Sequence, residues 1–76
     1  MITKAEREKM ILGDIGIEAR TERKRRGWKQ EDLSKRAAVG IDIIRRFEHG
    51  LSIGSAYMAA ILVELDLTLE VKENEQ

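Results

Sequence analysis

The sequence has 76 residues, enough for one domain with a thin hydrophobic core, so association with a second copy is an expected source of added stability. Apolar residues make up 42% and charged residues 37% of the chain, and this balance, without a long apolar run, excludes a membrane-spanning protein. The absence of cysteine excludes disulfides and thiolate metal sites, and the net charge of zero means that attraction to a polyanion can come only from local charge.

Two helices are predicted in the first third of the chain. Thr3, followed three residues later by Glu6, fits a capping box and predicts a helix over residues 4–12. Asp14 is a candidate N-cap for a second helix over residues 15–26, whose basic end suits the negative pole of the helix dipole. The glycine that follows is expected to end this helix.

The middle of the chain carries two short helical patterns. Residues 30–37 and 41–48 both show helical spacing of apolar side chains, and the residues between them are too few for anything but a turn. In the second pattern Ile41, Ile44 and Phe47 recur on one face. The sequence therefore predicts two helices joined by a tight turn.

One more helix is predicted before the tail. Gly50 is placed as the left-handed cap that ends the preceding helix. Residues 55–65 are apolar almost all round, and Ser52 or Ser55 could supply the N-cap of a helix there.

The tail changes its period. Leu67, Leu69 and Val71 alternate with polar residues, which predicts a strand over residues 67–72 with one buried face. A single strand has no partner in so small a domain, so we expect these three residues to form a dimer contact with a second copy. Residues 1–76 are thus predicted to be one all-α domain of four or five helices with a short C-terminal β-strand.

Charge is segregated along the chain although its sum is zero. Residues 20–36 hold eight basic and three acidic side chains, a local net charge of +5, whereas residues 66–76 hold four acids and one lysine, a local net charge of −3. A polyanion responds to the field within roughly 8–10 Å. The basic segment therefore predicts contact with nucleic acid, and a solvated helix face is the alternative.

Residues 30–49 fit the pattern of a helix-turn-helix. Two short helices joined by a tight turn cannot form a core alone, but the first can hold the second outward. This arrangement needs apolar side chains where the helices meet and a small one where they cross. The apolar positions are Leu33, Ala37, Val39, Ile44 and Phe47, and the small one is Ser34.

The run Arg23-x-x-x-Gly27-Trp28-x-Gln30-x-x-Leu33-x-x-x-Ala37, followed by Ile44-x-x-Phe47-Glu48-x-Gly50, resembles the helix-turn-helix of the Cro/C1 (XRE-type) repressors, over about residues 15–65. The resemblance implies a lambda-repressor-like fold and a homodimer that represses transcription by binding an inverted repeat in double-stranded DNA. It implies a structural ion pair between Arg23 and Glu48, and a phosphate contact at Gln30. It also places these residues over the major groove: Gly40, Ile41, Asp42, Arg45 and Arg46.

The sequence departs from this family pattern in three places. Ala38 occupies the turn position usually held by glycine, where a left-handed conformation costs an alanine roughly 1 kcal/mol. Gly40 replaces the usual Ser or Thr cap of the second helix of the unit. Ile41 and Ile43 make the expected DNA-reading face unusually apolar.

Several side chains of this unit admit more than one role. Arg46 is expected to donate to guanine O6 and N7, whereas Arg45 and Lys29 are expected to contact phosphate or solvent. Asp42 could accept a hydrogen bond from cytosine, or only favour the start of the helix. Ile41 could contact a thymine methyl group or pack in the core.

Nothing in the sequence points to catalysis or to a cofactor. His49 is the only histidine, so no metal site is expected. The carboxylates lie on different elements, with no nucleophile or phosphate loop beside them. Trp28 is expected to anchor on the core. We therefore expect a protein that is not an enzyme. We also expect it to be cytoplasmic, because no segment resembles a signal peptide.

Two alternatives stay open. Residues 61–71 resemble the end of HipB-like antitoxins, which implies an autorepressor that also binds a toxin protein. The alternative from another class is a helical protein-interaction module that does not bind DNA. The zero net charge and the apolar Ile41 and Ile43 favour that module.

Overall fold

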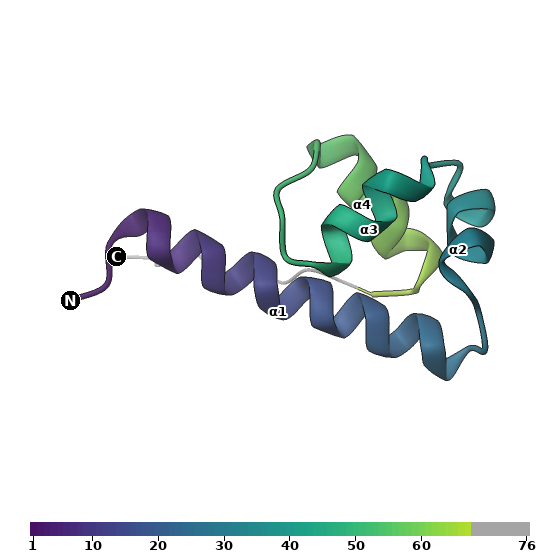
Figure 1. Ribbon diagram of the computed structural model, residues 1–76, viewed down its shortest axis with the longest axis horizontal. Helices are drawn as coiled ribbons and strands as arrows, with labels where there is room; N and C mark the ends of the chain where they lie inside the picture. The colour runs from purple at the N-terminus through teal and green to yellow at the C-terminus, as the bar shows by residue number, and fades with distance from the viewer. Residues whose placement is uncertain (68–76) are drawn as a thin grey trace.

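The computed structural model describes residues 1–67, and within them the chain forms four α-helices (Figure 1). The helices are α1 (Lys4–Arg25), α2 (Gln30–Ala37), α3 (Ile41–Glu48) and α4 (Ser55–Glu64). The predicted all-helical class is confirmed for this part of the chain. Leu67 has no regular secondary structure, and the rest of the predicted strand lies outside the described residues. None of the four helices is long and apolar enough to cross a membrane.

One long helix replaces the two that the sequence predicts before Gly27. The capping box is present: the Glu6 amide donates to Thr3 Oγ1 at 3.1 Å, and the Thr3 amide donates to Glu6 Oε1 at 2.8 Å. Asp14 is not an N-cap, because it lies in the interior of α1, a continuous helix of 22 residues. Its end is as predicted, since Gly27 follows with a φ of +74°.

The helices form a small bundle with a projecting rod. Helices α2, α3 and α4 pack together beside the C-terminal half of α1, and the N-terminal half of α1 extends past them (Figure 1). The molecule is correspondingly elongated, with extents of 41 × 22 × 21 Å. Residues 1–11 are all exposed.

The core lies where the predicted helix-turn-helix meets α1 and α4. The predicted contact residues Leu33, Val39, Ile44 and Phe47 are buried, and Ala37 is half-buried against them. Apolar burial drives this packing because each such side chain contributes roughly 1.5–3 kcal/mol. The remaining buried apolar residues are Ala19, Ile61, Leu62 and Leu65.

The turns around α3 follow the sequence prediction at both ends. Ala38 adopts the left-handed conformation, with φ 57° and ψ 45°, and Ser34 Oγ donates to the Val39 carbonyl at 2.5 Å. Gly50 has a φ of +79° just after α3. Helix α3 is thereby held at a fixed angle to α2.

The predicted cap of α4 is wrong. The N-cap residue is Gly54, which makes no side-chain hydrogen bond, and Ser55 is already the first helical residue. The amide of Met58 donates to the Gly54 carbonyl at 3.0 Å. This helix has no side-chain cap and is stabilised by the burial of Ile61 and Leu62 in the core.

Candidate nucleic-acid interface

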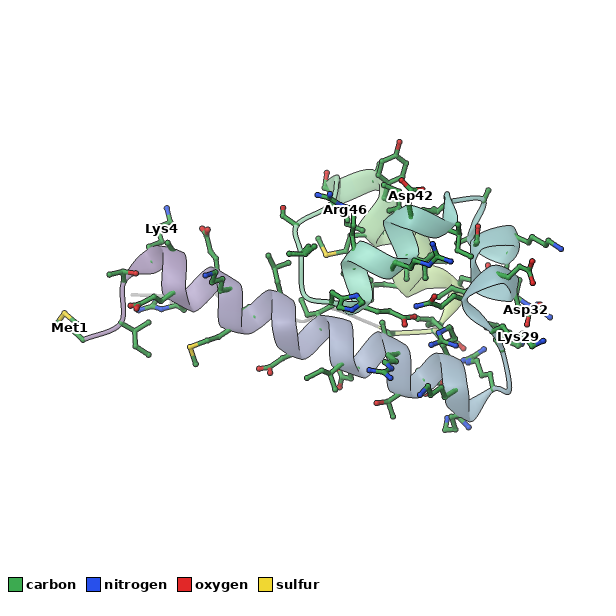
Figure 2. The ribbon with its side chains drawn as sticks, viewed as in Figure 1. Met1, Lys4, Lys29, Asp32, Asp42 and Arg46 are labelled. Atoms are coloured by element: carbon green, nitrogen blue, oxygen red, sulfur yellow. The ribbon has the colours of Figure 1, made fainter. Side chains whose placement is uncertain are left out.

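Helix α3 presents one polar face to solvent. Asp42, Arg45, Arg46 and His49 are exposed, whereas Ile44, on the opposite face, is fully buried. Figure 2 shows Asp42 and Arg46 on the side of the bundle away from α1. Arg46 Nη2 donates to the Ser52 carbonyl at 3.3 Å, and His49 Nδ1 lies 2.8 Å from the Arg45 carbonyl.

The apolar character predicted for this face is confined to one residue. Ile43 packs against the core, and Ile41 is only half-buried and borders a surface hollow. At the start of the helix, Gly40 makes no side-chain cap. The carboxylate of Asp42 lies close to it, because a Cβ built on Gly40 would be 2.8 Å from Asp42 Oδ1. Asp42 therefore occupies the first turn, where the helix dipole favours an acid.

A buried ion pair ties α3 to α1. Arg23 Nε and Nη2 donate to the two carboxylate oxygens of Glu48 at 2.7 and 3.1 Å, and the two side chains are 8% and 3% exposed. Arg23 Nη1 donates to the Trp28 carbonyl at 2.8 Å, and Gln30 Nε2 donates to Glu48 Oε1 at 3.1 Å. The structure thus brings together the two residues that the family resemblance pairs, and adds Gln30 to them.

A hollow of about 690 Å³ lies over this network, between α1, the start of α2 and α3. Four exposed cations border it: Arg20 and Lys24 from α1, Lys29 before α2, and Arg45 from α3. None of the four forms an ion pair with an acid among residues 1–67. One exposed acid, Glu31, also borders the hollow, so the four cations leave a net positive charge beside the exposed face of α3.

Arg20 and Lys24 were not among the residues that the sequence assigned to the site. Both residues contribute to the net charge of +5 over residues 20–36, but that sum does not show the direction in which either side chain points. Their spacing of one helical turn is the signal that could have found them, because it places both on one side of α1.

Three further cations of the basic segment, Arg25, Arg26 and Arg36, are engaged elsewhere. Arg25 and Arg26 both pair with Glu22, and their hydrogen bonds, that of Arg25 above all, lower the pKa of the Glu22 carboxyl to about 2. Arg26 and Arg36 stack on the ring of Trp28, at 5.2 and 4.2 Å from its centroid. Trp28 itself packs against the core, as predicted.

The remaining predicted site residues have mixed placements. The Lys29 side chain is exposed, and its amide donates to Asp32 Oδ2 at 2.8 Å at the start of α2 (Figure 2). The Gln30 side chain is held by Glu48. Of the expected dimer contact, Leu67 is half-buried against its own core, and Leu69 and Val71 lie outside the described residues. Among residues 1–67, no group of three His, Cys, Asp or Glu side chains could hold a metal ion.

Comparison of the chain with models of protein families, with curated proteins and with solved structures found no match. The resemblance to the Cro/C1 repressors therefore depends on the motif residues alone.

Proposed function

We propose that the chain is a sequence-specific DNA-binding protein of the lambda-repressor-like class that regulates transcription, with α3 inserted into the major groove. The observation that supports this most is the exposed polar face of α3 beside the cation-bordered hollow. The major groove admits an α-helix, and phosphate contacts on its flanks fix the register of that helix. The buried pair of Arg23 and Glu48 keeps α3 from tilting on its support.

Base recognition is assigned to the residues that project from α3. Arg46 is exposed, and its one side-chain hydrogen bond within residues 1–67 is long, so its guanidinium can exchange the Ser52 carbonyl for guanine O6 and N7. Ile41, at the edge of the hollow, is available to a thymine methyl group. Gly40 lets the DNA approach the backbone at the start of the helix. Asp42 either accepts from cytosine N4 or serves the helix start alone.

Phosphate binding is assigned to the cations of the hollow. Lys29 and Arg45 are the residues that the sequence predicts in this role, and Lys24 extends it onto α1. A net charge of zero does not oppose the assignment, since the field that a phosphate experiences is set by charges within roughly 8–10 Å.

Two copies are needed for specific binding. One short helix contacts few base pairs, and dimers of such domains read half-sites about one helical turn apart. The proposed operator is therefore an inverted repeat, and the proposed regulator is a homodimer of the repressor type.

Selection of sites from a random duplex pool tests the proposal, followed by titration of the selected and scrambled duplexes. An enriched inverted repeat, bound far more tightly than scrambled DNA, is the expected result. Arg46→Ala is expected to reduce the affinity for the selected site by about 1–3 kcal/mol and to relax preference at one base pair. Arg25→Ala is the matched control, because it removes an arginine that is already paired with Glu22.

A protein-interaction module without DNA binding is the second candidate, and the exposed apolar residues of α1 favour it. Met10, Ile11 and Ile17 are about half exposed or more. This candidate predicts that no DNA site is enriched in the selection. It also predicts that any binding to DNA is weak and salt-sensitive, and that Arg46→Ala does not change it. The two candidates are thus separated by the same selection experiment.

A further inference from the structure

The exposed side of α1 carries an apolar pair that nothing in the chain covers within residues 1–67. Met10 is 56% and Ile17 is 62% exposed. Successive helical residues are about 100° apart, so these two residues lie within about 20° of each other on one face. Ala19, which is fully buried in the bundle, lies about 160° around the helix from Ile17. The pair therefore points away from the bundle.

The N-terminal half of α1 also lacks the packing that normally stabilises a helix. It projects beyond the bundle, with residues 1–11 all exposed (Figure 1). Isolated helices shorter than roughly 12–15 residues are marginal in water, and most helical stability comes from burying one face. A partner along this face would supply that burial.

We propose that this face of α1 pairs with the same face of a second copy, the two helices running antiparallel across a two-fold axis near Gly13. In this register Met10 of each copy opposes Ile17 of the other. A two-fold axis makes the contact self-complementary, so every pair of residues occurs twice.

Charge complementarity selects both the partner and the direction. On one flank, Glu6 of each copy comes opposite Arg20 of the other, and on the other flank Arg7 comes opposite Glu18. Arg7, Glu18 and Arg20 form no ion pair among residues 1–67, so all three are available. A parallel pair would instead set each charge beside its own copy, which is unfavourable.

The expected strength is modest. A contact limited to one helix from each copy falls below the roughly 1,200 Å² of a standard interface, a size that is typical of weak and transient complexes. Asp14 lies near the axis and opposes its own copy, a like-charge contact that weakens the pair. Asp14→Asn is therefore expected to lower the Kd of the dimer several-fold, and a rise in Kd would contradict this register.

Sedimentation equilibrium of the full chain without DNA, over a concentration series up to roughly 100 μM, tests the pairing. The unmodified chain is expected to dimerise, and Ile17→Glu to raise the Kd at least about tenfold because it buries a charge in the seam. Ile17 is exposed, so this change leaves the fold intact, which circular dichroism checks. Lys35→Glu, an exposed change on α2, is the control and leaves the Kd unchanged.

A charge exchange tests the antiparallel register. Arg7→Glu and Glu18→Arg are each expected to weaken the dimer several-fold, and the double variant to restore it, because the opposing charges are then only exchanged. The two residues are three turns apart on one helix, so no contact within a single copy can produce the rescue.

Three results would overturn the proposal: a monomer at every concentration, a dimer that Ile17→Glu leaves unchanged, or a double variant no better than the single ones. Loss of the dimer on Leu69→Glu alone would assign the contact to the tail. The pairing rests on the proposed function in that it supplies the second copy for an inverted repeat. The size measurement needs no DNA, and site selection needs no particular dimer contact, so each can fail without the other.

Discussion

Gly16 lies in the interior of α1 against the end of α3, so closely that a Cβ on it would overlap the Phe47 carbonyl oxygen and lie 3.3 Å from the Glu48 carbonyl oxygen. Both neighbours are backbone atoms and cannot rotate away. Gly16→Ala is therefore expected to lower the free energy of unfolding by about 1–3 kcal/mol, although alanine is the better helix former. Urea denaturation monitored by circular dichroism measures this.

Gly13 provides the matched control on the same helix, because a Cβ on it would meet nothing within 4 Å. Gly13→Ala is expected to raise the free energy of unfolding by up to about 1 kcal/mol, the intrinsic helical preference of alanine. Both variants are compared at a protein concentration low enough to keep the chain monomeric. Equal effects of the two changes would show that close packing at Gly16 is not decisive.

The pair of Arg23 and Glu48 is expected to be costly to break on one side. Both side chains are nearly fully buried, so Glu48→Ala leaves an uncompensated charge on Arg23 and is expected to lower the free energy of unfolding by about 3–5 kcal/mol. The double change Arg23→Met with Glu48→Leu is expected to cost less than Glu48→Ala alone, because no charge stays buried. Chemical denaturation of the three chains forms the test, and a double variant less stable than the single one would contradict it.

At the scale of the helices, the end of α1 is held by Glu22, whose carboxyl has a pKa lowered from the ordinary 4.5 to about 2 by Arg25 and Arg26. A lowered pKa in the folded state contributes stability that is complete above the unfolded value and is lost as the pH falls towards the folded value. The contribution of Glu22 is therefore expected to be constant above about pH 4.5 and to disappear between that pH and about pH 2.

Carboxyl NMR titration of Glu22 checks this directly. The corresponding comparison is the acid unfolding of Glu22→Gln, which is expected to lose part of the pH dependence in that window and none above it. If the pKa of Glu22 measured in solution is near its ordinary value, the two arginines do not form lasting ion pairs with its carboxylate.

The elements that the sequence predicts correctly are those whose signal is local. Leu33, Ile44 and Phe47 recur at helical spacing within the segments that they stabilise, so α2 and α3 have the predicted bounds. The break predicted at residues 13–14 is wrong because Asp14 fits the local pattern of an N-cap although it lies inside one continuous helix. Gly16, two residues further on, shows what the local pattern does not contain. Its role is a contact with Phe47, thirty-one positions away along the chain, which no local pattern contains.

The candidate site shows the same division. Ile41, Asp42, Arg45 and Arg46 follow from the position of α3 in its motif, and in the structure the last three are exposed and Ile41 is half-buried. That Arg20 and Lys24 share a hollow with Arg45 follows only from the packing of α1 on α3. Likewise Ile43 could be assigned to the core only once α3 had been placed.

For the molecule as a whole, α1 packs on the bundle with one side and carries the proposed dimer contact on the opposite side. The face with Met10 and Ile17 is directed away from the bundle, and Arg20 and Lys24, which border the hollow, follow Ile17 by three and seven residues and so lie next to that face. A second copy on that face would leave the exposed residues of α3 uncovered. The proposed base contacts of α3 and the proposed dimer contact are therefore compatible in space, and DNA binding would in turn favour the dimer by holding two copies on adjacent half-sites.

The hollow predicts how binding depends on salt. Each phosphate contact contributes roughly −0.9 to the slope of log affinity against log salt. Lys24 and Arg45 border the hollow from different helices, so Lys24→Gln and Arg45→Gln are each expected to reduce the slope by about one contact. Because phosphates carry no sequence information, affinity for selected and scrambled duplexes is expected to fall by the same factor. Arg25→Gln, at an arginine paired with Glu22, is expected to leave the slope unchanged. A slope that responds to Arg25 and not to Lys24 or Arg45 would place the DNA on a different side of the molecule.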